Sequence, residues 1–260
     1  MADKMKQEII ERMNEYVAGH PDNMLEDGGR VFDLPLIGYA SADDDMFNEL
    51  KKPEIIGPEH WSPKEWLTDA KTIISYFLPF TEEMRESNRE PGLPAEQLTL
   101  TLINGFNNAV RRYLADTVTE LGGAAVAPVL EDSWHWLHII SNWSERHAAY
   151  IAGLGTFGLS KFLITEKGCA GRLGSVITSL EIEADQRPYT HFDQYCPFLS
   201  EGLCGECIKR CPAGAISVKG KNNWICKMYM DTISFRYAPG YGCAKCQMGV
   251  PCEAHLPFKN

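Results

Sequence analysis

The stretch Cys196-Pro-Phe-Leu-Ser-Glu-Gly-Leu-Cys204-Gly-Glu-Cys207-Ile-Lys-Arg-Cys211-Pro212 has the cysteine spacing C-x7-C-x2-C-x3-C-P. Bacterial ferredoxins bind [4Fe–4S] clusters with the run C-x2-C-x2-C-x3-C-P, whose fourth cysteine ligates the other of the two clusters. The present stretch keeps the second and third intervals and the final proline, and it lengthens only the first interval. It therefore predicts an iron–sulfur domain of the two-cluster ferredoxin type.

The number of cysteines predicts how many clusters the domain holds. Eight cysteines lie in the last quarter of the chain, and each [4Fe–4S] cluster needs four thiolates, so we expect two clusters. By the crossed ferredoxin pattern, the first cluster is expected to bind Cys196, Cys204, Cys207 and Cys252. The second is expected to bind Cys211, Cys226, Cys243 and Cys246. Pro212 fits this scheme, because it ends the short helix after Cys207 and directs Cys211 to the second cluster.

Two other uses of these cysteines have to be weighed. The pairs Cys204/Cys207 and Cys243/Cys246 could together bind one zinc ion, but half of the cysteines would then have no role. Disulfides need an oxidising compartment, and the charged N-terminus has no apolar signal core, which predicts a cytoplasmic location. The ninth cysteine, Cys169, stands apart in the sequence and is expected to be a small residue in a turn.

Composition and charge narrow the class of protein. The chain has 260 residues, of which 44% are hydrophobic, and its apolar stretches are too short to span a bilayer. Its formal net charge of −10 argues against nucleic acid as a partner. From residue 194 onward there are eight Lys/Arg and four Asp/Glu, a balance of +4, which leaves −14 for residues 1–193. This basic excess either offsets buried cluster charge or is a chance fluctuation of the surface.

The remaining sequence predicts an α+β fold that precedes the cysteines. We expect helices at residues 3–18, 62–67, 98–121 and 135–152. We expect strands within residues 31–37, 71–80, 124–130, 161–165 and 173–182. Residues 81–96 are predicted to form an exposed loop and residues 183–193 a linker. The domain boundaries that follow are 1–186 for the α+β domain and 187–260 for the ferredoxin-like domain.

Two segments of the α+β part carry candidate functional residues. His135 and His138, one helical turn apart, could bind a metal, but aromatic packing around a cofactor or a plain core is the simpler interpretation. The run Gly153-Leu-Gly-Thr-Phe-Gly158 contains three glycines, which permit a close approach between backbone and ligand. A dinucleotide-binding loop would follow a strand, whereas this one follows a predicted helix, so that interpretation is rejected.

This part of the chain resembles a known family. The residues that carry the resemblance are 145–158, Leu163-Ile-Thr165 and Leu173-Gly-Ser-Val-Ile-Thr178, together with the cysteine motifs. Over residues 124–252 they resemble the epoxyqueuosine reductases, which are related to the corrinoid-dependent reductive dehalogenases. Cys226 matches the lone cysteine that this family has between its two cysteine motifs.

The resemblance implies a cofactor and a direction of electron flow. It implies a nitroreductase-like N-terminal domain that holds cobalamin, with the glycine run against the corrin ring. The residues expected to contact the corrinoid are Gly153, Leu154, Gly155, Gly158, Leu173 and Gly174. A donor such as ferredoxin or flavodoxin would supply electrons, and the two clusters would pass them singly to cobalt.

Departures from the family pattern bear on the substrate. The family's catalytic aspartate lies fourteen residues before the first glycine of the run, a position that Ile139 occupies; a shifted alignment would offer His138 or Asp132. Ser175 stands where the family has glutamate, and Gly158-Leu-Ser160 replaces Gly-Lys-Asn. The family's C-terminal helical repeats for tRNA do not follow Cys252. We therefore expect a substrate other than tRNA.

Three functions remain open at this point. The first is a cobalamin-dependent reductase of a small organic molecule. The second is an electron-transfer protein that reduces or stores a corrinoid and has no organic substrate of its own, which the missing acid favours. The third is a ferredoxin-type module with a structural N-terminal domain, which the retained glycine run opposes.

Overall fold

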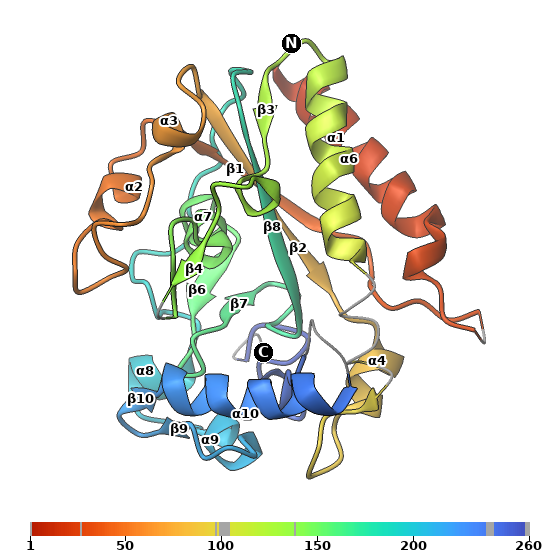
Figure 1. Cartoon of the computed structure of the whole chain (residues 1–260), viewed down its shortest axis with the longest axis vertical. Coiled ribbons are helices and arrows are strands. Elements are labelled where there is room, and N and C mark those ends of the chain that lie inside the picture. Colours follow the sequence, from red (N-terminus) through yellow and green to blue (C-terminus); the bar gives the residue numbers. More distant parts are fainter. Residues whose placement is uncertain are drawn as a thin grey trace.

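A four-stranded antiparallel sheet organises the molecule. The computed structural model describes residues 2–26, 28–96, 98, 105–137, 139–237 and 242–257 (Figure 1). The sheet has the order β1-β2-β8-β3, formed by Leu36–Ser41, Thr72–Pro79, Gly171–Thr178 and Ala125–Val126. Its long central pair runs in register from Thr72 opposite Thr178 to Pro79 opposite Gly171.

Strand β2 is central because its sequence, Thr-Ile-Ile-Ser-Tyr-Phe-Leu-Pro, is rich in β-branched and aromatic residues and is buried throughout. Successive side chains point to opposite faces of the sheet, so each face joins a separate core. Ile74 packs with residues of α1 (Ala2–Gly19) and α6 (Phe106–Glu120), which cover one face. Ile73 packs with residues of α7 (Glu145–Ile151), which covers the other (Figure 1).

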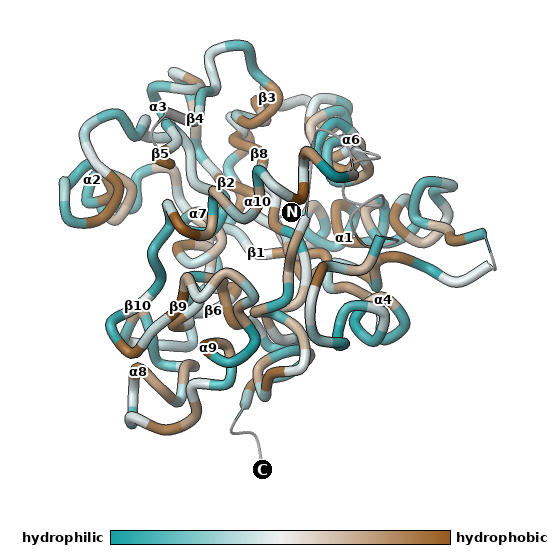
Figure 2. The backbone as a smooth tube through the Cα atoms, turned by 60° about the horizontal axis from the view of Figure 1, so that its bottom comes forward, coloured by the Kyte–Doolittle hydropathy of each residue, from teal (hydrophilic) through white to brown (hydrophobic). Residues whose placement is uncertain are grey.

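The cysteine-rich segment lies at one end of this sheet, and α10 crosses the bottom of the view in Figure 1. Its elements are α8 (Pro197–Glu201), α9 (Glu206–Arg210), β9 (Ile216–Ser217), β10 (Gly220–Lys221), α10 (Asn223–Tyr237) and the 3-10 helix η3 (Lys245–Gln247). Figure 2 shows α8, α9, β9 and β10 gathered in one part of the molecule, and β6 (Gly155–Phe157) belongs to the part above them in Figure 1. One apolar cluster joins the two parts, because Ile164 of β7 (Leu163–Thr165) packs with Cys196 and Val250.

The helix predicted over residues 135–152 is wrong in its first half. Strands β4 (Trp136–Leu137) and β5 (Ile140–Ser141) form a hairpin there, and only α7 is helical. The Asn142 side chain stabilises the hairpin, since it accepts from the backbone N–H of His135 at 3.0 Å and donates to the carbonyl of Ser133 at 3.0 Å. The aromatic and apolar spacing of this stretch satisfies a helix as well as a hairpin, so periodicity alone chose the wrong element.

Other predicted boundaries also need correction. The first strand is β1, which begins at Leu36 instead of lying within residues 31–37, because Pro35 has no N–H for the sheet. Residues 81–96 include helix α4 (Glu82–Ser87), and Thr81 caps its start by accepting from Met84 N–H at 3.4 Å.

The predicted strands after α6 and after α7 differ from the observed ones. Only Ala125–Val126 of the segment 124–130 is strand, and η2 (Pro128–Leu130) follows it. Strand β7 pairs with β6 and not with β8, so the glycine run is itself partly a strand. The predicted helix 98–121 is observed as α6, and residues 99–104 lie outside the described part of the chain. None of the described helices is long and apolar enough to cross a membrane.

Candidate functional site

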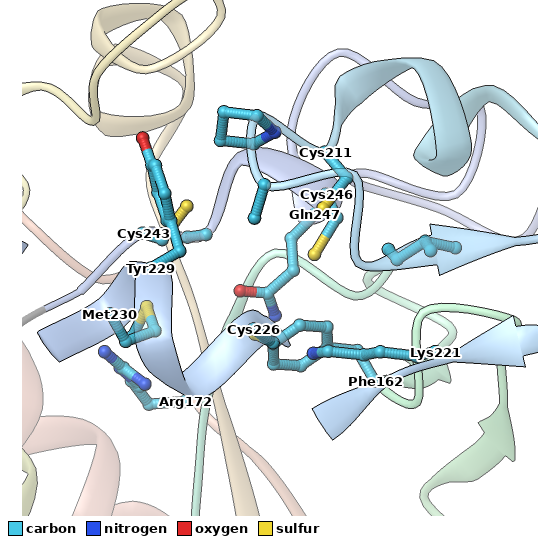
Figure 3. A pocket seen from close by; sticks show the side chains of 14 residues that line it. Phe162, Arg172, Cys211, Lys221, Cys226, Tyr229, Met230, Cys243, Cys246 and Gln247 are labelled. Atoms are coloured by element: carbon cyan, nitrogen blue, oxygen red, sulfur yellow. The ribbon is translucent and has the colours of Figure 1, made fainter. Parts of the chain in front are cut away.

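Four of the eight cysteines line one cavity of about 70 Å³ between α9, α10 and η3 (Figure 3). They are the four that the crossed pattern assigns to the second cluster: Cys211, Cys226, Cys243 and Cys246. Cys211 ends α9, Cys226 lies in the first turn of α10, and Cys246 belongs to η3. We call this space the cluster-two cavity.

The other four cysteines are also neighbours. Burial, followed by the negative charges of Cys252, Cys196 and Cys204, raises the pKa of Cys207 to about 12. Cys196 is buried at the start of α8, whereas Cys204 is exposed in a left-handed conformation with φ of 79°. The four side chains therefore gather near α8 and α9, as expected if they are the ligands of the first cluster.

Two thiols of the cluster-two cavity have raised pKa values. Burial raises the pKa of Cys246 to about 12 and that of Cys243 to about 11. A cluster would displace these protons, because only thiolates ligate iron. Among the described residues, no group of three or more His, Cys, Asp or Glu converges to hold a single metal ion. The donor set and the room between the thiols thus fit a cluster.

A buried asparagine fastens the second cysteine segment to α4. Asn88 is fully buried, and its Nδ2 donates to the carbonyl of Cys243 at 2.8 Å while its Oδ1 accepts from Ala95 N–H at 3.0 Å. The buried Lys245 adds a second link, because its Nζ donates to the carbonyl of Asn88 at 3.2 Å. The segment that carries Cys243 and Cys246 is therefore positioned by the N-terminal half of the chain.

The ninth cysteine stands apart in the sequence but not in space. Cys169 lies in a bend just after the turn at residues 166–167 and is 1% exposed. Its Sγ lies 3.7 Å from Sγ of Cys252. Its N–H donates to the carbonyl of Cys252 at 2.8 Å. The preceding Gly168 has φ of 76°, and a Cβ there would lie 2.2 Å from the carbonyl oxygen of Glu253. The segment Gly168-Cys169, which leads into strand β8, is thus in close contact with the segment that carries Cys252.

Because Cys169 lies so close to Cys252, a variant of Cys169 tests whether Cys169 is itself a cluster ligand. Because eight other thiols complete both clusters, Cys169→Ala is expected to leave iron at about eight per chain. Anaerobic iron and sulfide analysis measures this, with Cys169→Ser as a variant of nearly equal size. Loss of half of the iron from Cys169→Ala would instead make Cys169 a ligand and Cys196 or Cys252 the spare thiol.

A cavity of about 980 Å³, which we call the large cavity, lies next to the cluster-two cavity. Its walls come from the segment around α2 (Met46–Glu49), the β4–β5 hairpin, α7, and the start of α10. Apolar and aromatic side chains dominate the lining, among them Ile139, Phe157 and Trp224. Lys221 lines both cavities, so a molecule in the large cavity would adjoin the second cluster.

Several groups in the large cavity can hold or exchange protons, and sequence reasoning missed them. His147 lines the cavity, and burial, followed by the charge of Arg146, lowers its pKa to about 3, so its ring is neutral. Its Nδ1 lies 2.7 Å from Oγ of Ser144. Tyr150 also lines the cavity, and burial raises its pKa. No motif signals these residues, because they come together only through the first turns of α7.

The six residues expected to contact a corrinoid do not share one cavity. Gly153 and Leu154 line a second cavity of about 400 Å³, whereas Gly158 lines the large one. Gly155 lines none of the three cavities; a Cβ there would lie 2.1 Å from the carbonyl oxygen of Ile164 in β7. Backbone packing between β6 and β7 therefore requires this glycine.

Leu173 and Gly174 are likewise held by the interior of the fold. A Cβ at position 174 would lie 2.2 Å from the ring of Tyr76, so glycine makes room for that side chain. The carbonyl of Leu173 accepts from Asn107 Nδ2 at 3.0 Å and from Arg111 at 2.9 Å. Their likeness to the family pattern is thus explained by packing around β8.

Comparison with known proteins agrees with this arrangement. No family model matches the chain. It is 34% identical over 119 residues to an epoxyqueuosine reductase of Listeria monocytogenes, which covers 42% of this chain and 29% of that protein. An epoxyqueuosine reductase of Lactococcus garvieae is 25% identical over 242 residues, 83% of this chain and 64% of that protein. The chain is similar to the epoxyqueuosine reductases. The predicted resemblance is confirmed.

Solved structures show the same fold. The epoxyqueuosine reductase of Streptococcus thermophilus superposes with a TM-score of 0.56 at 20% identity, over 98% of this chain and 68% of that one. The reductive dehalogenase NpRdhA superposes with a TM-score of 0.55 at 15% identity, over 86% of this chain and 30% of that one. The matches span less than two thirds of the length of these two curated epoxyqueuosine reductases. The part that is common to this chain and the solved structures has the fold described above.

The structure places the residue that replaces the family's acid. Ile139 lines the large cavity from the turn of the β4–β5 hairpin, with φ of 64°, a conformation that is costly for a β-branched residue. Asp132 is exposed and does not line this cavity, and His138 lies outside the described residues. The carboxylates that do line the cavity are Glu49 and Glu54, on the opposite wall.

The second departure, Ser175, has a compensating partner. Its hydroxyl donates to the carboxylate of Glu145 and accepts from Trp143 Nε1 at 2.9 Å. Glu145 also accepts from Arg111 Nε at 3.0 Å, with side chains 14% and 7% exposed. The carboxylate of Glu145 thus links α7 to β8 and α6, and it holds the helix that lines the large cavity.

Proposed function

We propose that this chain is an iron–sulfur oxidoreductase in which two [4Fe–4S] clusters deliver electrons to a corrinoid in the large cavity. The observation that carries the proposal is the shared wall at Lys221: the cavity lined by four cysteines adjoins the large cavity of about 980 Å³. The similarity to epoxyqueuosine reductases and reductive dehalogenases supports a redox activity of this kind. An electron donor such as ferredoxin or flavodoxin would complete the path.

The cavity residues fit such an occupant. A volume of about 980 Å³ is at the upper end of the range for ligand pockets, and aromatic side chains such as Tyr150 and Phe157 suit a large planar ring. When bound, the clusters would supply single electrons and the corrinoid a reducible cobalt centre. The chain's own task is then to exclude water with its apolar wall and to offer protons from groups such as Tyr150 or Glu54.

The substrate we propose is a small organic molecule and not tRNA. One similar structure is of an epoxyqueuosine reductase with a modified tRNA stem loop, so RNA is the alternative that needs testing. The net charge of −10 opposes RNA binding, and Ile139 offers no proton where the family has its acid. The same apolar side chain favours the second candidate function, a protein that reduces or stores a corrinoid without a substrate of its own.

Calorimetric titration of the cluster-loaded protein with cobalamin tests the proposal. Wild-type protein is expected to bind one cobalamin. Ile140→Trp is expected to weaken binding by about tenfold or more, about 1.4 kcal/mol, because it enlarges an exposed side chain that lines the large cavity. Gly155→Val would not discriminate, because its side chain would collide with β7 whatever the cavity holds.

Leu154→Phe is the matched control, since it adds bulk to the second cavity instead. Its affinity is expected to stay within about twofold of wild type. Weakening by Leu154→Phe but not by Ile140→Trp would move the corrinoid to the second cavity. If titration of the cluster-loaded wild type with cobalamin gives no heat, the chain does not bind the corrinoid. Electron transfer without a corrinoid then becomes the proposed function.

A further inference from the structure

Three cations converge on one wall of the large cavity from three separate segments. They are Arg146 of α7, Lys161 in the turn between β6 and β7, and Lys221 at the end of β10; together we call them the basic wall. Lys161 and Arg146 are tied together, because Arg146 Nη1 donates to the carbonyl of Lys161 at 2.7 Å. The ammonium of Lys221 lies 4.8 Å from the ring centre of Phe162.

The basic wall has no carboxylate to balance it. In the described part of the chain, none of its three side chains forms an ion pair with Asp or Glu, although the acidic surface supplies partners for many other cations. The carboxylates of the same cavity, Glu49 and Glu54, lie on the α2 side, and Glu49 is paired with Lys52. The cations and the carboxylates of the large cavity therefore come from different segments of the chain.

Keeping these cations together costs free energy. Burial lowers the pKa of Lys161, and the charges of Arg146 and Lys221 lower it further, so the three groups repel one another. Lys161 also has φ of 61°, which is unfavourable for a residue with a Cβ. Its backbone is fixed there by a hydrogen bond from its N–H to the carbonyl of Gly158 at 2.8 Å. The charge of Cys226 partly opposes the lowering of the pKa of Arg146, and a bound anion would add negative charge on the side of the large cavity.

We propose that the basic wall binds an anionic oxygen group, a phosphate or a carboxylate, of the molecule that occupies the large cavity. The inference rests on the proposed function, because it assumes that the large cavity holds the molecule that receives the electrons. The guanidinium of Arg146 can donate two parallel hydrogen bonds to such a group, and the lysines add point charges. The apolar wall around Ile139 then receives the rest of the molecule, which places it beside the second cluster.

The test uses pyrophosphate as a probe and the cluster-loaded full chain. Titration calorimetry is expected to show one site per chain, and Lys161→Gln and Arg146→Gln are each expected to weaken it about tenfold, the loss of one charge-assisted hydrogen bond. Lys219→Gln is the matched control. It removes the same charge from the β9–β10 hairpin, two residues from Lys221, but it does not line the cavity. Its affinity is expected to stay within about twofold of wild type.

A second measurement reports on the position of the anion. Because Lys221 lines both cavities, an anion held there adds negative charge beside the second cluster and is expected to lower its reduction potential. Spectroscopic redox titration with and without pyrophosphate measures this change. Lys161→Gln should abolish the change at the same probe concentration, whereas Lys219→Gln should keep it.

Corrinoids distinguish the two sources of such an anion. Cobalamin carries a phosphodiester, and cobinamide is a corrinoid without it. If Lys161→Gln weakens cobalamin but not cobinamide, the basic wall holds the cofactor's phosphate; if it weakens only pyrophosphate, the anion belongs to a separate substrate. Absence of pyrophosphate binding by wild type, or equal loss in Lys219→Gln, overturns the inference. Iron analysis of the same samples tests the clusters separately, so a failed redox function remains distinguishable from a failed anion site.

Discussion

Cys211→Ala is expected to lower the iron content from about eight to about four atoms per chain, with an equal loss of sulfide. The reason is that Cys211 lines the cluster-two cavity with three other cysteines, and a cluster deprived of one of four thiolates has no replacement there. Its Sγ also accepts the backbone N–H of Ala215 at 3.2 Å, so the position is built to hold a thiolate. Anaerobic iron and sulfide analysis, with electron paramagnetic resonance of the reduced protein, measures the loss.

Cys204→Ala is the matched variant for the other ligand set. It is expected to remove the other half of the iron, and the double variant with Cys211→Ala should retain none. Loss of all iron from either single variant would show that the cysteines do not divide into two independent sets. One tightly bound zinc and no sulfide in wild-type protein would contradict the cluster assignment altogether.

Glu145→Ala is expected to destabilise the protein by about 3–5 kcal/mol, the cost of leaving one member of a buried ion pair alone. Its partner Arg111 is 7% exposed on the side chain and would keep its charge without a carboxylate. For a chain of this size the loss corresponds to a fall of roughly 6–20 °C in Tm. Chemical unfolding followed by circular dichroism gives the free energy, and a melting curve gives Tm.

The double variant Arg111→Met/Glu145→Leu is the control for this prediction. It removes both charges and is expected to recover most of the lost stability, since apolar groups can replace a buried pair. The carbonyl of Leu173 keeps a donor in that variant, because Asn107 Nδ2 still reaches it at 3.0 Å. A loss below about 1 kcal/mol in Glu145→Ala would mean that water or another group balances Arg111, and that the network does not hold α7.

The sequence by itself determined the features that depend on local spacing and residue type. The interval pattern and the proline after Cys211 divided eight cysteines into two sets, and the structure brings the members of each set together. The run Thr72–Pro79 could be recognised as a central strand, because β-branched and aromatic residues without polar alternation suit burial on both faces. The long apolar stripe of Phe106–Glu120 predicted a helix for the same kind of reason.

Only the tertiary structure decided contacts between residues that are distant in the chain. Spacing could not show that Cys169 touches Cys252, that Ser175 bonds to Glu145, or that the basic wall borders the cluster-two cavity. It also misassigned the hairpin before α7, where a buried asparagine side chain outweighs helical periodicity. The physical reason is that hydrogen bonds and charge balance at a site depend on which chain segments meet, and this follows from packing of the whole sheet.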